Sequence, residues 1–162
     1  MLTIRPAQEH DVPTIYHMLY ESAIAQGGEH DLCVTPENLR EDGFGAEPKF
    51  QCLIAEWDGE PAAVALYFFV YSSWFSRSVL YLEDLYTAPK FRRKGIAAAL
   101  LSRLARIAVE AGCRQVRCLV LRSNAAALHF YQSMGAQVNA DWSPVYLEGE
   151  ALRRMAERTE SA

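Results

Sequence analysis

The strand, turn and helix expected over residues 78–112 constrain the fold most, because they follow one another with no intervening linker. Ser78–Thr87 is rich in β-branched and aromatic residues and predicts a central strand. From Gly95 the apolar residues recur at helical spacing until Gly112, which predicts a helix of about five turns. The basic turn between them, from Arg92 to Gly95, must therefore join a buried strand to a buried helix.

The remaining segments predict further strands and helices around this unit. Strands are expected at Leu2–Pro6, Phe50–Trp57, Ala62–Tyr71, Gln115–Leu121 and Ala140–Leu147, and helices from Asp11 to Ile24, from Thr35 to Asp42 with Gly43 closing it, over Asn124–Met134, and in the polar tail. Asp58-Gly59 favours a tight hairpin turn between two of these strands. The order predicts an α/β fold in which helices flank a mixed, mostly antiparallel sheet. The length of 162 residues suits a single domain over 1–162.

Composition and patterning exclude several classes of protein. A net charge of −4 lacks the basic excess of nucleic-acid binders, so no nucleic-acid partner is expected. The longest apolar stretch, Pro61–Tyr71, is too short to span a bilayer, so no membrane partner is expected either. The N-terminal residues show no secretory leader, and we expect a cytoplasmic protein whose four cysteines are reduced. The four histidines lack a metal-ligand spacing, so no metal site is expected.

The basic turn itself indicates an anion site. Three consecutive cations, Arg92, Arg93 and Lys94, are unfavourable at a helix N-terminus unless an anion binds there. Gly95 allows close approach of the backbone, so a pyrophosphate would fit the turn. The spacing matches neither a P-loop nor a dinucleotide fingerprint. A solvated basic loop is the alternative.

At this junction the sequence resembles the Gcn5-related N-acetyltransferases. Their coenzyme A loop follows the pattern [QR]-x-x-G-x-[GA], matched by Arg92, Gly95 and Ala97, and Asn124 and Tyr131 match a second conserved pair. Separate segments resemble the diamine acetyltransferases in particular, a subgroup that includes spermidine/spermine and thialysine acetyltransferases; these segments are 39–45, 52–56, 80–84 and 124–131. The resemblance covers nearly the whole chain. It implies a single-domain fold with a splayed central strand pair, acetyl-CoA as co-substrate and no metal.

The resemblance also implies roles for individual residues. Glu83 matches the general base that deprotonates the acceptor amine, and Tyr131 matches the general acid that protonates the departing thiolate. A surface carboxylate and a core tyrosine are the respective alternatives. The implied cofactor-binding residues are Leu85 and Tyr86, through main-chain groups, together with Arg92, Arg93, Lys94, Gly95, Ile96, Ala97 and Asn124.

The acceptor site is where the sequence departs from the subgroup. Asp84 matches an acceptor-site carboxylate, but strand alternation sends it to the face opposite Glu83, so only one of the two is expected to face the acceptor. Gln26 stands where those enzymes carry a substrate-contacting glutamate, and Glu29 and Asp31 are expected to compensate. Trp74 either lines the pocket for the acceptor or packs against other side chains.

These observations predict an acetyl-CoA-dependent N-acetyltransferase that acts directly on a small cationic amine, such as a diamine, a polyamine or a thialysine-like amino acid. Two alternatives stay open, a protein lysine or N-terminal acetyltransferase and a non-catalytic acyl-CoA sensor. The resemblance further implies a homodimer, and the tail from Ala140 to Arg154 is the segment expected to contribute to its interface.

Overall fold

The computed structural model describes residues 1–158 and divides into two compact units, Met1–Val120 and Leu121–Ala162. The first unit contains β1 (Leu2–Pro6), η1 (Glu9–Asp11), α1 (Val12–Gln26), α2 (Pro36–Phe44), β2 (Gln51–Trp57), β3 (Glu60–Ser72), β4 (Arg77–Thr87), η2 (Pro89–Phe91), α3 (Ile96–Glu110) and β5 (Val116–Arg117). The second contains α4 (Ala125–Ser133) and α5 (Gly149–Ala156). The expectation of one domain over 1–162 stays a prediction.

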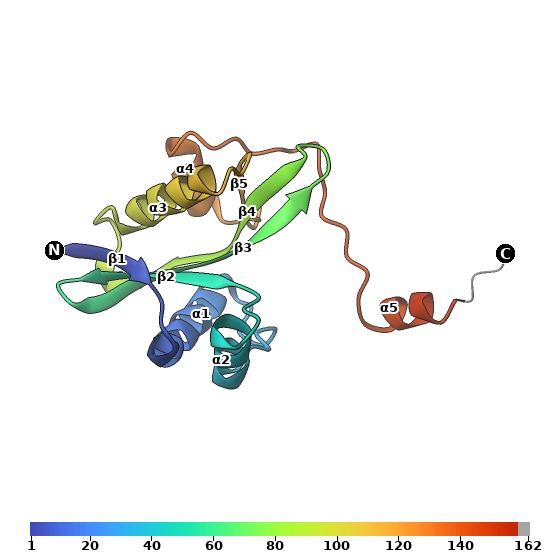
Figure 1. Cartoon of the computed structure of the whole chain (residues 1–162), viewed down its shortest axis with the longest axis horizontal. Helices are drawn as coiled ribbons and strands as arrows, with labels where there is room; N and C mark the ends of the chain where they lie inside the picture. The colour runs from blue at the N-terminus through green and yellow to red at the C-terminus, as the bar shows by residue number, and fades with distance from the viewer. Residues whose placement is uncertain (159–162) are drawn as a thin grey trace. The chain divides into compact units, whose positions relative to one another are not determined.

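The five strands form one sheet in the order β1-β2-β3-β4-β5. Every neighbouring pair is antiparallel except β4 and β5, which run parallel, so the expected α/β fold with a mixed, mostly antiparallel sheet is confirmed. In Figure 1, α1 and α2 cover one face of the sheet and α3 covers the other. Fully buried side chains of the sheet and of the helices that cover it form the core, among them Ile15, Val64 and Leu100.

The parallel pair of strands, β4 and β5, separates almost at once. β5 pairs with β4 only through Val116 opposite Leu80 and Arg117 opposite Tyr81, whereas β4 continues to Thr87. Within the first unit, the later part of β4 is therefore paired with β3 alone, as the splayed strand pair requires. The strand expected over Gln115–Leu121 is correspondingly too long, because Leu119 and Leu121 are exposed and have no core face to cover.

At two helix ends, the residue expected to start or stop the helix has a different role. Gly43 does not close α2, because the helix runs on to Phe44. A side chain at Gly43 would lie 2.5 Å from an atom of the Phe50 ring. The glycine therefore permits close packing within the helix. Asp11 precedes α1 as expected, but its carboxylate caps no helical N–H of α1.

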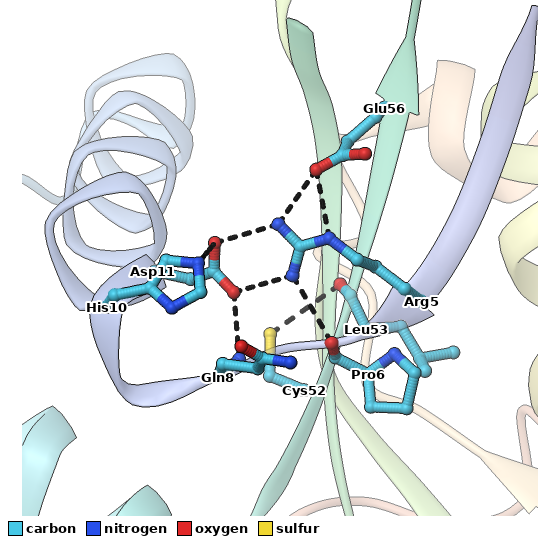
Figure 2. A network of polar contacts seen from close by, with 8 residues as sticks. All are labelled: Arg5, Pro6, Gln8, His10, Asp11, Cys52, Leu53 and Glu56. Atoms are coloured by element: carbon cyan, nitrogen blue, oxygen red, sulfur yellow. Dashed lines mark hydrogen bonds and ion pairs between the residues drawn. The ribbon is translucent and has the colours of Figure 1, made fainter. Parts of the chain in front are cut away.

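The Asp11 carboxylate instead joins a polar network that links β1, η1 and β2. It accepts from both terminal nitrogens of Arg5, at 2.7 and 2.9 Å, and from the backbone N–H of Gln8 at 2.8 Å. Figure 2 shows the Arg5 guanidinium between Asp11 and Glu56. The guanidinium also donates two hydrogen bonds to the Glu56 carboxylate, at 2.7 and 2.9 Å. Asp11 is only 5% exposed, and the Arg5 guanidinium holds the pKa of its carboxyl below the usual range. The network fixes the start of α1 to the sheet edge.

The turns that join the strands follow the sequence closely. Asp58 and Gly59 both have positive φ angles, 52° and 81°, as the two-residue hairpin between β2 and β3 requires. In the second unit, Asn124 caps α4 by accepting from the N–H of Ala127 at 3.1 Å. The strand expected over Ala140–Leu147 is wrong, because this segment joins no ladder among residues 1–158. Over that same range, no helix has the length and apolar character needed to cross a membrane.

Candidate active site

The centre of β4 carries a β-bulge at Glu83. In the register with β3, Asp84 lies opposite Leu66 and Leu82 lies opposite Tyr67, so Glu83 is an extra residue without a partner. A bulge interrupts the regular alternation of side chains along a strand. The expectation that Glu83 and Asp84 lie on opposite faces stays a prediction. The sequence alone could not show the bulge, since Glu83 is an extra residue only relative to the partner strand β3.

The two carboxylates differ sharply in environment. Glu83 is exposed, whereas Asp84 is largely covered by its neighbours. Burial, and to a smaller extent the nearby negative charge of Glu83, together raise the pKa of Asp84 to about 6. Near neutral pH, a cation would relieve both effects by pairing with the Asp84 carboxylate. The pair therefore has the chemistry of a site for an ammonium group.

Beyond β4, the backbone turns into α3 through residues with left-handed conformations. Arg93 has a φ angle of 63° and Gly95 one of 77°, and Gly95 directly precedes the first helical residue, Ile96. No heavy atom lies within 4 Å of where a Gly95 side chain would begin. The N–H groups of the first helical turn, which include those of Ile96 and Ala97, have no acceptors within the helix. This open, donor-rich turn fits an anion such as a pyrophosphate.

The side chains of the turn are held in different ways. Lys94 lies above the rings of Trp57 and Phe91, at 4.9 and 5.3 Å from their centres, and Lys90 pairs with Glu60 on the hairpin turn. Arg92 donates from Nε to the carbonyl of Thr87 at 3.1 Å and lies 5.8 Å from the centre of the Tyr86 ring. Arg92 and Lys94 thus have defined contacts although both are exposed, and the anion site stays a prediction.

The Tyr86 side chain is a functional candidate that sequence reasoning passed over in favour of its main chain. It is 7% exposed, and the Arg92 guanidinium lies 5.8 Å from the centre of its ring. Burial, and after it the negative charge of Glu21 on α1, raises the pKa of the Tyr86 hydroxyl. The only signal in the sequence is an aromatic residue just before the basic turn. Glu21 carries no local signal at all, because its proximity arises from packing of α1 against β4.

The residues expected to bind the acceptor occupy separate parts of the first unit. Gln26 ends α1 and donates back to Ser22, while Glu29 and Asp31 lie in the loop that follows. One carboxylate oxygen of Glu29 is buried and has no hydrogen-bond partner in the described chain, which suits a cation. Trp74 lies in the turn between β3 and β4 and is 81% exposed. No hydrogen bond or ion pair among residues 1–158 links Gln26, Glu29 or Asp31 to the carboxylates of β4.

Asn124 and Tyr131 lie in the second unit. Asn124 caps α4 from outside its first turn, and Tyr131 lies within that helix with its ring 5.2 Å from the ring of Phe130. The proposed cofactor contact of Asn124 and the acid role of Tyr131 stay predictions.

Comparison with known proteins shows a close family match. Residues 14–136 match the acetyltransferase (GNAT) family. The chain is 38% identical to thialysine N-epsilon-acetyltransferase of Mus musculus, over 96% of this chain and 97% of that protein. It is 36% identical to spermidine/spermine N(1)-acetyltransferase-like protein 1 of Homo sapiens, over 82% of this chain and 20% of that longer protein. A solved structure with a TM-score of 0.82 and 21% identity, an integron cassette protein of V. cholerae, covers 97% of this chain and 98% of its own, and shares the fold.

Proposed function

The chain belongs to the acetyltransferase (GNAT) family and is an N-acetyltransferase, and we propose that it acetylates a primary amine of a small cationic acceptor, with acetyl-CoA as donor. The proposed acceptors are diamines, polyamines and thialysine-like amino acids. The names of the mouse and human relatives, which refer to thialysine and to spermidine/spermine, support this choice. We also propose a cytoplasmic location.

The observation that carries the proposal is the pair of carboxylates at the β4 bulge. An alkyl amine has a pKa of about 10, so it is a cation at neutral pH and must lose a proton before it can attack a carbonyl. Glu83 is the proposed general base, because it is the more exposed carboxylate and can accept that proton directly or through water. Asp84 is the proposed anchor, because its buried carboxylate gains most from a neighbouring positive charge.

Acetyl-CoA suits the turn that precedes α3. When bound, it supplies an acetyl group activated as a thioester. We propose that Arg92, Arg93, Lys94, Gly95, Ile96 and Ala97 hold its diphosphate, and that main-chain groups of Leu85 and Tyr86 on the unpaired side of β4 align its pantetheine arm. Asn124 is a further proposed contact. Tyr131 is the proposed general acid that donates its phenolic proton to the departing sulfur, in direct transfer without a covalent enzyme intermediate.

The loop after α1 is the proposed second anchor for the acceptor. Gln26 has no charge, whereas Glu29 has a buried, unpartnered carboxylate oxygen and Asp31 adds a further negative charge. We propose that Glu29 and Asp31 attract the distal cation of the acceptor, with Trp74 contributing an aromatic surface. A short amine with one distal charge should then be preferred over a long polyamine.

The test is the rate of free-thiol release from acetyl-CoA with putrescine, spermidine, spermine, thialysine, lysine and a lysine-containing peptide. We expect a small diamine or thialysine to have the highest kcat/KM. Glu83→Gln should lower kcat by about 100-fold or more, since general-base contributions have that size, and Tyr131→Phe should also lower kcat. Glu37→Gln, on the exposed first turn of α2, is the matched control and should retain wild-type activity.

Other outcomes discriminate the alternatives. Activity confined to the peptide would favour a protein acetyltransferase, and binding of acetyl-CoA without turnover of any amine would favour an acyl-CoA sensor. Full kcat in Tyr131→Phe would remove the general-acid assignment while leaving the overall function intact.

A further inference from the structure

We propose that Trp57 is a positioning residue for the acetyl-CoA site. Its ring holds the Lys94 ammonium beside the turn before α3, so that this cation is already in place when the diphosphate binds. The inference rests on the proposed function, because it takes that turn as the acetyl-CoA site. It also gives a role to the β2–β3 hairpin, which the reaction scheme above does not use.

The end of the β2–β3 hairpin contacts the basic turn through two side chains. Trp57 is the last residue of β2 and lies opposite Glu60, the first residue of β3, so the two side chains share one face of the hairpin. Nζ of Lys94 lies 4.9 Å from the centre of the Trp57 ring, and Lys90 forms an ion pair with Glu60. Each of the two lysines is therefore held by its own residue of the hairpin.

The two hairpin residues differ in what they do to the charge of the lysine. The Glu60 carboxylate neutralises Lys90 as it holds it. An aromatic ring attracts a cation through its quadrupole but has no net charge, so Lys94 keeps its full positive charge beside Trp57. Among residues 1–158 no ion pair involves Lys94, and the residue is exposed. An anion can therefore approach Lys94 on the side away from the ring.

The buried ring of Phe91 adds to the restraint. Phe91 is 5% exposed, and the centre of its ring lies 5.3 Å from Nζ of Lys94. Lys94 directly precedes Gly95, the residue before the first turn of α3, where the helix dipole repels a cation. The attraction of a ring for a cation is of the same order as this repulsion. The rings therefore keep Lys94 at the turn, and a lysine already held there loses less freedom when a diphosphate binds.

The experiment measures coenzyme A binding by titration calorimetry in variants of the two residues. Trp57→Leu should weaken binding about threefold, the size expected when one long side chain must be ordered on binding. Lys94→Met should weaken binding more, about tenfold, because the charge itself is lost. The double variant should bind as Lys94→Met does, because the ring acts only through the lysine. In steady-state kinetics each variant should raise KM for acetyl-CoA and leave kcat unchanged.

Three further variants complete the comparison, each measured below its melting temperature. Trp57→Phe keeps a ring and should bind nearly as the wild type does. Trp57→Val removes the ring but suits a strand, and it should show the same loss as Trp57→Leu. Glu60→Gln is the matched control, because it releases Lys90 from the same end of the hairpin while the Lys94 contacts remain. It should bind coenzyme A with wild-type affinity.

Three results would overturn the inference and leave the proposed function standing. They are wild-type affinity in both Trp57→Leu and Trp57→Val, a loss in Trp57→Phe as large as that in Trp57→Leu, and a further threefold loss when Trp57→Leu is added to Lys94→Met. The last result would mean that the ring acts through the fold and not through the lysine. Failure of the wild type to bind coenzyme A would instead overturn the proposed function, and this inference with it.

Discussion

At the scale of single residues, the carboxyl of Asp84 should make folding depend on pH. Its pKa rises from 3.8 to about 6 on folding, so ionisation opposes folding once the pH exceeds the unfolded value. The opposition is complete above about pH 6 and absent below about pH 4, where both states are protonated. Asp84→Asn should therefore raise the free energy of unfolding by about 3 kcal/mol at pH 8, with the gain disappearing below pH 4.

Urea unfolding of both proteins between pH 3 and pH 8 measures this difference. NMR titration of the Asp84 carboxyl provides an independent readout, and in Glu83→Gln its pKa should fall because a neighbouring negative charge is gone. A stability difference that grows at acidic pH would contradict the assignment. Because Asp84 is also the proposed acceptor anchor, Asp84→Asn should in addition raise KM for a cationic amine.

At the scale of secondary-structure elements, the Arg5 network joins β1, η1 and β2 through one buried carboxylate. Asp11→Asn should lower the free energy of unfolding at pH 7 by about 2 kcal/mol, since it removes charge-assisted hydrogen bonds and leaves Arg5 with Glu56 as its one carboxylate partner among the described residues. The Asp11 pKa is lowered on folding, so its contribution is present above the unfolded pKa and is lost as pH falls through the folded pKa. The two proteins should therefore converge in stability at strongly acidic pH.

Asp42→Asn is the matched control for this comparison. Asp42 pairs with Lys49 at 2.6 Å, but the lysine side chain is 73% exposed. Exposed ion pairs contribute little to stability, so this variant should unfold almost as the wild type does. Equal losses of stability in Asp11→Asn and Asp42→Asn would contradict the prediction, because the buried Arg5 network would then stabilise the fold no more than an exposed ion pair does.

At the scale of the whole molecule, the tail beyond α4 is rich in exposed apolar residues. Val145 and Tyr146 are 90% and 69% exposed, and Leu152 and Met155 lie three residues apart on α5 at 52% and 48%. Exposed apolar side chains gathered in one segment are typical of an interface. We propose that a second copy of the chain covers this tail, in line with the dimer that the resemblance implies.

Light scattering at micromolar concentration tests the dimer. We expect twice the 18.2 kDa mass of one chain for the wild type and a single-chain mass when Leu152 and Met155 are both changed to Glu. Val109→Glu places a charge at a 77% exposed position of α3 and should leave the mass unchanged. A wild-type species of 18.2 kDa would contradict the proposal.

Local sequence determined the features that depend on neighbouring residues. The period change at Gly95 located α3, the Asp58-Gly59 pair located the hairpin, and Thr35 and Asn124 each cap the helix that they precede. Hydrophobic periodicity, turn conformation and capping act over a few residues, so they can be identified without the partner elements. The motif in the basic turn likewise identified the family.

Tertiary structure alone decided the features that depend on contact between distant segments. The bulge at Glu83 exists only in register with β3, the role of Gly43 depends on the ring of Phe50, and the arginine that pairs with Asp11 comes from another element. The strand expected after α3 shortened to two residues, because pairing with β4 and not β-propensity sets the length of a ladder. Side-chain pairing across a sheet and burial against a helix are properties of the packed chain, and no local pattern records them.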